Sequence, residues 1–358
     1  MKGFSLQPRS LCGAIASLLL VGLATTSCSN GTSGNEIRGA LTAVGSPVQS
    51  DAIDAWSNAW RKTNTATSLN YSPDGSRVGI TALATGQAYF AATDSPISPQ
   101  DQTQTQARCG PAGAFSVPVS VTSLGVAFNL PSVTGLKLSP AVLAEIFSGN
   151  INRWDDDAIV SINPNTRLPS ADIVPIVATE SSALTLAATK YLSSSQKWLV
   201  GDVPVWSVPR TGLEVKKYRD LPSKLNETAG AIAFMDVASI GNRFDTALLS
   251  FGGDFIRQSK DSIALAAREG LTSEGATGVE FTLPAHSERG YPLGLVNFQA
   301  FCSTYPSQQL TTLVKSWALY VLGADGQIAS NYFGNVGSPS EVALRKSAQR
   351  IKEIEAAG

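Results

Sequence analysis

The sequence contains little histidine and little charge, and each shortage argues against a class of function. Its 358 residues include one histidine, His286, which argues against histidine-ligated zinc and against a Ser-His-Asp catalytic triad. Charged residues make up 15% of the chain and the formal net charge is −1, so the composition does not predict a nucleic-acid-binding surface. The length is sufficient for two globular lobes rather than one.

Long apolar runs are also scarce, and the main one belongs to a predicted targeting segment, residues 1–27. This run, Leu11 to Ala24, is too short for a comfortable membrane span. Small residues then precede Cys28, which is typical of a lipoprotein signal cleaved before a lipid-modified cysteine. The alternative is a plain signal peptide cleaved near Ala24. With residues 28–36 as a lipidated polar tether, we expect a protein anchored to the outer face of a bacterial cell membrane.

Cysteine is rare, and its distribution predicts one disulfide. Of the four cysteines, Cys12 lies in the targeting segment and Cys28 is the expected lipid site, which leaves Cys109 and Cys302. Outside the cytoplasm a lone pair is more often bridged than free. We therefore predict a Cys109–Cys302 disulfide; the alternative is a pair of buried free thiols.

The central motif of the chain runs from Asn70 to Ser98. A Pro-Asp-Gly turn leads into Ser76, a helical pattern follows, and a short apolar strand from Tyr89 to Ala92 leads to Asp94. Ligands in open α/β sheets bind outside the carboxyl ends of strands, and a helix N-terminus offers N–H groups to an anion. This pattern predicts a ligand site containing Ser76 and Asp94; the alternative is an ordinary βαβ unit with a capped helix.

A similar junction opens the mature chain. Residues 37–46 predict a strand and residues 47–62 an amphipathic helix that places Trp56 and Trp60 in the core. Ser46 lies where the strand meets the helix. It is therefore a third polar candidate for the same edge of the sheet.

Further along, strand and helix patterns continue to alternate, which predicts the α/β class. Residues 114–129 form a nearly continuous apolar run, typical of a buried strand. Residues 173–192 repeat the plan of strand, polar turn and helix, with Glu180, Ser181 and Ser182 where the helix begins. We therefore predict that this second turn contributes to the ligand site.

Several motifs together resemble the phosphate-binding protein of bacterial phosphate ABC transporters (PstS type). They are the Asn-Tyr, Gly-Ser and Ala-x-Asp-x-Pro-x-Ser pattern of residues 70–98, the Ile-Phe-x-Gly and Trp-Asp-Asp unit of residues 146–156, and the strand of residues 230–234. The resemblance covers about residues 37–355. It implies a two-lobe periplasmic-binding-protein fold of the second type, with the ligand cleft between the lobes. We place lobe I at 37–115 plus 287–358 and lobe II at 116–286.

The resemblance also implies roles for individual residues. Ser76 and Asp94 match positions that contact the bound phosphate in the family. A carboxylate beside an anion is useful when the anion carries a proton, because it accepts that P–O–H, whereas sulfate lacks the donor and is repelled. Arg77 is a candidate for supplying positive charge to the site; the alternative is a solvated surface arginine.

Other family positions are altered. The phosphate-contacting positions of the first and second turns fall on Pro47, Ala178 and Leu184, and the family's aspartate falls on Glu180, whereas Ser182 is retained. The family's arginine is thus missing at Ala178. These departures predict weaker phosphate binding than is usual for the family.

Two functions follow, with a third disfavoured. The first is capture of inorganic phosphate for the permease subunits of an ABC importer, by a protein expected to be monomeric and to need no cofactor. The second is a PstS-like paralogue that binds another ligand, or phosphate weakly, in a sensor or interaction role. An extracellular phosphatase is disfavoured because the sequence has no evident metal cluster or activated nucleophile. We therefore expect a protein that is not an enzyme.

Overall fold

The computed structural model describes residues 37–206 and 212–357, so the predicted signal, Cys28 and tether lie outside the described residues. The strands are β1 Gly39–Gly45, β2 Thr67–Ser72, β3 Phe90–Thr93, β4 Ala114–Phe128, β5 Lys137–Leu138, β6 Val174–Ala178, β7 Leu213–Val215, β8 Ala231–Asp236, β9 Asp245–Thr246, β10 Leu248–Ser250, β11 Phe255–Ile256, β12 Leu271–Gly275, β13 Gly278–Thr282, β14 Gly294–Cys302, β15 Thr304–Tyr305 and β16 Glu355–Ala356. The α-helices are α1 Ser50–Thr63, α2 Ser76–Thr85, α3 Pro99–Cys109, α4 Pro140–Ser148, α5 Asp157–Val160, α6 Ala183–Leu192, α7 Leu221–Glu227, α8 Val237–Ile240, α9 Lys260–Arg268, α10 Gln308–Leu322, α11 Ala324–Phe333 and α12 Glu341–Lys352. Two short 3₁₀ turns are η1 Pro47–Gln49 and η2 Tyr218–Asp220.

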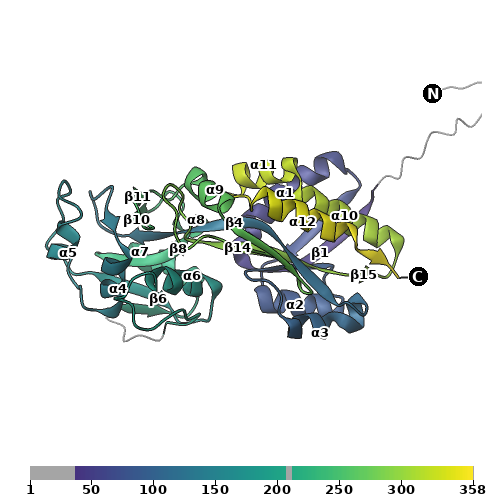
Figure 1. Ribbon diagram of the computed structural model, residues 1–358, viewed down its shortest axis with the longest axis horizontal. Coiled ribbons are helices and arrows are strands. Elements are labelled where there is room, and N and C mark those ends of the chain that lie inside the picture. Colours follow the sequence, from purple (N-terminus) through teal and green to yellow (C-terminus); the bar gives the residue numbers. More distant parts are fainter. Residues whose placement is uncertain (1–36, 207–211, 358) are drawn as a thin grey trace, which may run out of the picture. The chain divides into compact units, whose positions relative to one another are not determined.

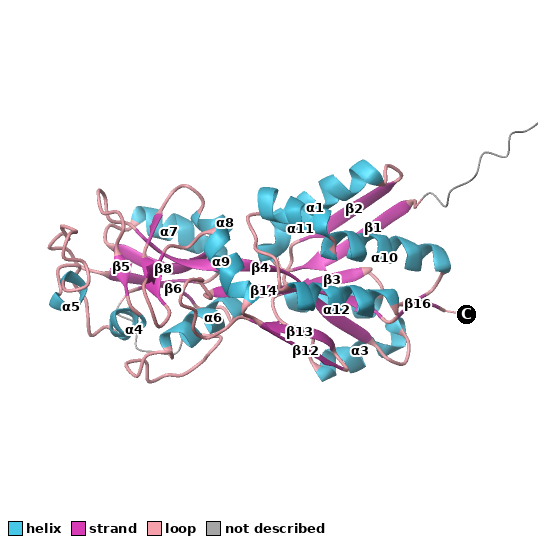
Figure 2. Ribbon diagram, turned by 45° about the horizontal axis from the view of Figure 1, so that its top comes forward, coloured by secondary structure: helices cyan, strands magenta, loops and turns pink. Residues whose placement is uncertain are grey.

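One large mixed sheet organises these elements. Its strand order is β2-β1-β3-β14-β4-β8-β6-β7, with β9, β12 and β13 attached beside this path. β1 pairs in parallel with β2 and β3, whereas β14 is antiparallel to both β3 and β4. Helices α1, α10 and α11 lie on one side of β1 and β3, and α2 and α3 lie on the other (Figures 1 and 2). The predicted α/β class is therefore confirmed.

Helix ends follow the local sequence. Ser139 caps α4, because its Oγ accepts a hydrogen bond from Val142 N at 3.2 Å, and Pro140 occupies the first turn, where an N–H is not needed. Gly149 ends the helix in the left-handed region, with φ 83°. Local sequence thus accounts for both ends of this helix.

The first core lies around β1, β3 and the C-terminal helices. The predicted core residues Trp56 and Trp60 are fully buried. The Trp60 ring meets Trp317 edge to face at 5.5 Å, and Trp317 stacks on Phe90 at 5.5 Å. Aromatic pairs of this kind add to the free energy gained by burying apolar area.

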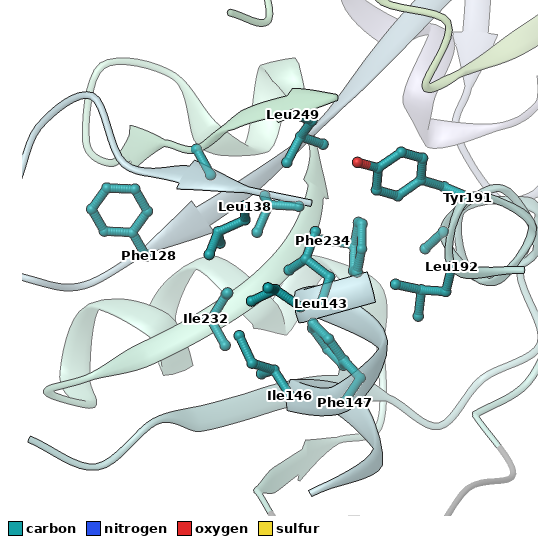
Figure 3. Packing of buried hydrophobic residues seen from close by; sticks show 14 of the residues in the cluster. Phe128, Leu138, Leu143, Ile146, Phe147, Tyr191, Leu192, Ile232, Phe234 and Leu249 are labelled. Carbon is teal, nitrogen blue, oxygen red and sulfur yellow. The ribbon is translucent and has the colours of Figure 1, made fainter. Parts of the chain in front are cut away.

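The second core lies around α4, α6 and the strands β8 and β10. Figure 3 shows Phe147 and Leu143 of α4 facing Phe234 of β8, with Tyr191 and Leu192 of α6 beside them. The Phe147 and Phe234 ring centroids are 5.1 Å apart. The predicted second lobe requires an apolar core of its own, and this cluster, which is separate from the first core, provides one.

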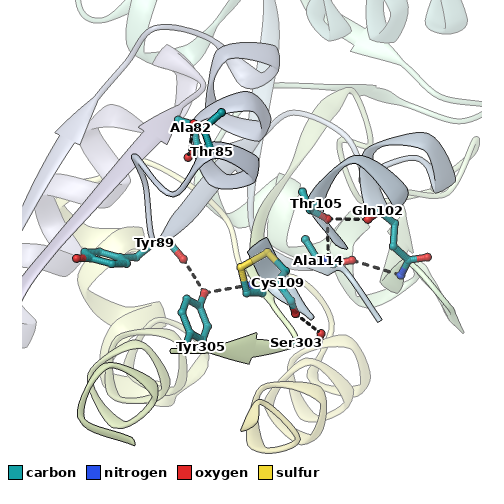
Figure 4. Close-up of a disulfide and its surroundings, with 10 residues drawn as sticks. Ala82, Thr85, Tyr89, Gln102, Thr105, Cys109, Ala114, Ser303 and Tyr305 are labelled. Atoms are coloured by element: carbon teal, nitrogen blue, oxygen red, sulfur yellow. Dashed lines mark hydrogen bonds between the residues drawn. A yellow bond between two sulfur atoms is a disulfide. The ribbon is translucent and has the colours of Figure 1, made fainter. Parts of the chain in front are cut away.

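A disulfide joins the last residue of α3 to the last residue of β14, and it confirms the predicted Cys109–Cys302 pair. Figure 4 shows the bond beside Tyr305, whose hydroxyl donates to Tyr89 O at 2.6 Å and accepts from Cys302 N at 3.1 Å. Both cysteines belong to the first core. The bridge therefore secures the helix that follows the Asp94 segment to a central strand of the sheet.

Strands β4 and β14 extend from the first core to the second. The hairpin β12–β13, which the sequence analysis assigned to lobe II, packs against the first core: Gly278 pairs with Ser116, and Val279 belongs to that cluster. The lobe bounds themselves stay a prediction. These contacts favour placing the hairpin with lobe I.

Candidate functional site

Three consecutive junctions bring polar groups to one edge of the sheet. Ser46 follows β1, Ser76 is the first residue of α2, and Asp94 follows β3. Parallel pairing of β1 with its two neighbours places the carboxyl ends of these strands together. At Gly45 a side chain is impossible without rearrangement, because a Cβ would lie 2.1 Å from Ala92 O.

Ser76 and Asp94 form a reciprocal contact with each other. Ser76 Oγ donates to Asp94 Oδ2 at 3.1 Å and accepts from Asp94 N at 3.2 Å. Gly75, with φ 108°, turns the chain into α2, so Ser76 lies in the first helical turn. The second carboxylate oxygen, Asp94 Oδ1, is buried and has no hydrogen-bond partner within the described residues. It is a free acceptor at a helix N-terminus.

The surroundings of Asp94 shift the pKa of its carboxyl group upward. Burial raises the pKa of Asp94 above its ordinary value, the hydroxyls of Ser46 and Ser76 oppose the shift, and the charge of Asp236 adds to it. Asp236 caps α8: its Oδ1 accepts from Ala238 N and Ser239 N at 3.1 and 3.0 Å. Asp94 is thus the carboxylate with an oxygen left for a ligand.

Ser46 is fully buried and shapes the turn after β1. Its Oγ accepts from Val48 N at 3.1 Å, and Pro47 contributes no N–H. Tyr71 OH donates to Ser46 O at 2.5 Å. Burial raises the pKa of Tyr71 far above its ordinary value, with the charges of Asp94 and Asp74 adding to the shift, so Tyr71 remains a neutral donor.

Arg77 is engaged elsewhere. Its Nη1 lies 2.6 Å from Asp101 Oδ1, and 75% of the arginine side chain is exposed. Asp101 is held in the capping box of α3 with Ser98. This pair favours the alternative, a surface arginine paired with α3, and a role of Arg77 in supplying charge to the ligand stays a prediction.

The second predicted turn uses its polar groups within the protein. Ser182 caps α6, and its Oγ accepts from Thr185 N at 3.0 Å. Glu180 accepts from Tyr218 N at 2.5 Å through Oε1, and its Oε2 lies 3.3 Å from Lys217 Nζ. Ser181 is exposed. The structure thus gives Ser182 and Glu180 structural partners, and their predicted ligand role stays a prediction.

Two positions that contact phosphate in the family, Ala178 and Leu184, hold apolar side chains that pack in the interior of this protein. Ala178 at the end of β6 is fully buried, and Leu184 in α6 is 5% exposed. They belong to two different apolar clusters of the described chain. Neither position can donate a side-chain hydrogen bond.

The sequence analysis missed three residues near the site: Tyr71, Asp236 and Gln49. Tyr71 stands in the Asn-Tyr pair at the end of β2, and Asp236 ends a strand as Asp94 nearly does, so strand-end polarity could have identified both. Gln49 is fully buried, and a glutamine in the first turn of an amphipathic helix gives no comparable signal.

Residues 30–325 match the PBP superfamily domain. The chain belongs to the PBP superfamily. One relative of this PBP-superfamily chain, "Phosphate-binding protein PstS 3" of Mycobacterium tuberculosis, is 29% identical over 321 residues, which cover 86% of this chain and 85% of that protein. "Phosphate-binding protein PstS 2" of the same species is 26% identical over 367 residues, covering 94% and 97%.

Solved structures agree on the fold. The periplasmic phosphate-binding protein PfluDING, bound with phosphate, has a TM-score of 0.66 at 16% identity, covering 86% of this chain and 92% of that one. A phosphate-binding protein from Stenotrophomonas maltophilia has a TM-score of 0.63 at 17% identity, covering 87% and 94%. The predicted two-lobe periplasmic-binding-protein fold is therefore confirmed.

Among the described residues, no helix is long and apolar enough to cross a membrane. No group of three or more histidine, cysteine, aspartate or glutamate side chains in the same residues is arranged to hold a metal ion.

Proposed function

We propose that this PBP-superfamily protein captures inorganic phosphate outside the cytoplasmic membrane and delivers it to the permease of an ABC importer. The observation that carries the proposal is the free Asp94 Oδ1 beside Ser76, in the first turn of α2. Helix N–H groups suit phosphate oxygens, the serine hydroxyl holds the carboxylate in place, and the carboxylate accepts the proton of a protonated oxyanion. The names of the relatives support the same ligand.

Equilibrium binding tests this proposal directly. Calorimetric titration of the purified protein with inorganic phosphate should give a saturable 1:1 heat, and sulfate at equal concentration should give none. Sulfate lacks the proton that Asp94 accepts, and it places a full negative charge against the carboxylate. Equal binding of both anions would contradict the assigned role of Asp94.

A second candidate function is a PstS-like paralogue that binds phosphate weakly or binds another ligand. Its support is the apolar burial of Ala178 and Leu184, together with the engagement of Arg77 by Asp101. Such a protein would serve as a sensor or interaction partner. Absence of heat with either anion, for a protein that unfolds cooperatively, would favour this candidate.

The cellular setting is part of the proposal. A lipid on Cys28, with residues 29–36 as tether, would hold the monomeric protein at the outer face of the membrane near its permease. Cys28→Ser should leave the protein unprocessed or release it into the medium, as cell fractionation and mass spectrometry would show. A mature Cys28→Ser protein still in the membrane fraction would contradict lipidation. The role is binding rather than catalysis.

A further inference from the structure

The crossing strands β4 and β14 contain an irregularity between the two cores. Val119 of β4 belongs to the first core and Leu124 to the second, so the segment between them joins the two clusters. The ladder shifts register there: Asn297 pairs with Ser120, but Phe298 pairs with Pro118. Val119 is the extra residue, as in a β-bulge.

A proline at this irregularity, Pro118, removes one backbone hydrogen-bond donor from β4. Pro118 has no N–H to donate to its partner strand. A buried side chain donates instead: Gln49 Nε2 lies 3.1 Å from Phe298 O. A second buried glutamine acts in the same way on the extra residue, since Gln327 Nε2 lies 2.9 Å from Val119 O.

The two glutamines differ in their second contact. Gln49 Nε2 also donates to Thr93 O at 2.9 Å, and Thr93 directly precedes Asp94. Gln49 N donates to Ser46 O at 3.2 Å, so the same residue closes the turn that Ser46 begins. Gln327 Nε2 donates its second bond to Val321 O at 2.7 Å, in the neighbouring helix α10.

We propose that Gln49 is a positioning residue that couples the Pro118–Phe298 irregularity to the Ser46 and Asp94 ligand groups. Its amide fixes the carbonyl before Asp94 relative to the crossing strand, so a change in that strand alters the placement of the carboxylate. The inference rests on the proposed function for its ligand, inorganic phosphate. Gln49 itself touches no ligand in this role.

Two matched variants distinguish an effect of Gln49 on phosphate binding from its effect on folding stability. Gln49→Met and Gln327→Met each remove two buried donor contacts and keep a similar side-chain volume. We expect both to lower the melting temperature of the full-length protein. The loss of one buried hydrogen bond corresponds to about a tenfold change in an equilibrium constant. Gln49→Met should therefore weaken phosphate binding by roughly tenfold or more, whereas Gln327→Met should change the phosphate dissociation constant by about twofold at most. Equal weakening in both variants would overturn the proposal.

Amide hydrogen exchange without ligand gives a second test that does not depend on phosphate. Gln49→Met should speed exchange in peptides covering Ser46–Ser50 and Thr93–Ser95, and Gln327→Met should leave these peptides unchanged. Unchanged exchange in both variants would overturn the coupling. Wild-type protein that binds no phosphate would refute the proposed function alone. If Gln49→Met does not fold, Gln49→Asn, which keeps the amide but shortens its reach, should show the same selective change.

Discussion

Two turns of the molecule have the same plan and different outcomes. Both the Ser76 turn and the Glu180–Ser182 turn place polar residues between a strand and a helix N-terminus. Ser76 of the first turn contacts Asp94, which follows β3, and Asp94 Oδ1 is left without a partner among the described residues. In the second, Ser182 caps α6 and Glu180 binds the 217–218 backbone and side chain. We therefore place the proposed ligand site at the turn beside which a polar atom remains unused.

The largest effect should come from the disulfide, whose two cysteines both belong to the first core. Double replacement Cys109→Ser and Cys302→Ser opens a link across 193 positions. The chain-entropy model gives an upper figure of roughly 4–5 kcal/mol for a loop of this length. Denaturant unfolding should show that loss. Thiol titration of the unreduced, denatured mature protein should find neither Cys109 nor Cys302 free, and labelling of both residues would contradict the bond.

Replacing the unused carboxylate should remove the functional difference between the two turns. Asp94→Asn cannot accept the ligand proton in the same way, so phosphate binding should weaken by about a hundredfold, the value of a charged hydrogen bond. Sulfate binding should stay equal or improve, because the repelling charge is gone. Calorimetry with both anions measures this. The comparison would fail if the variant kept the wild-type preference for phosphate.

The same variant isolates a pH effect on stability. Burial raises the pKa of Asp94, so the folded protein holds this proton at a higher pH than the unfolded chain does. Between the ordinary and the raised pKa, stability must therefore fall as pH rises, because the charged form is penalised only when folded. Wild-type stability should decline relative to Asp94→Asn through this window. Parallel pH curves would show that Asp94 is not perturbed.

A smaller effect should distinguish Ser76 of the first turn from Ser182 of the second. Ser182→Ala removes an N-cap and should cost about 1 kcal/mol of unfolding free energy with anion binding unchanged. Ser76→Ala should weaken phosphate binding roughly tenfold, since it removes the hydroxyl that donates to Asp94 Oδ2 and accepts from Asp94 N, and so loosens the carboxylate. Thermal unfolding and calorimetry on both variants test this. Loss of phosphate binding in Ser182→Ala would restore the second turn to the site.

The smallest effect should come from Arg77. Its pair with Asp101 is largely exposed on the arginine side, and such pairs contribute roughly 0–1 kcal/mol. Arg77→Ala should leave the phosphate dissociation constant within about twofold of the wild-type value, because the Arg77 guanidinium pairs with Asp101 of α3. A large loss of affinity would return Arg77 to the ligand site.

Local chemistry was sufficient to predict much of this molecule. Gly75 followed by Ser76 marks a turn into a helix, and Asp94 follows a short apolar strand, so both positions were identifiable from the sequence. The two cysteines beyond the predicted lipid site, Cys28, had one intramolecular pairing available, and the structure contains it. The burial of Trp56 and Trp60 followed from helical periodicity.

The tertiary structure decided which polar groups remain available. Arg77 meets Asp101 from another helix, Tyr71 meets Ser46 across two strands, and Asp236 comes near Asp94 from a distant part of the chain. Ser182 and Glu180 look like ligand groups in sequence, yet their partners in the fold engage them. The sequence determines which groups can bind, because turn and cap preferences act over a few residues. Only long-range packing determines which of them are left unpaired, since hydrogen-bond partners come from segments far apart in the chain.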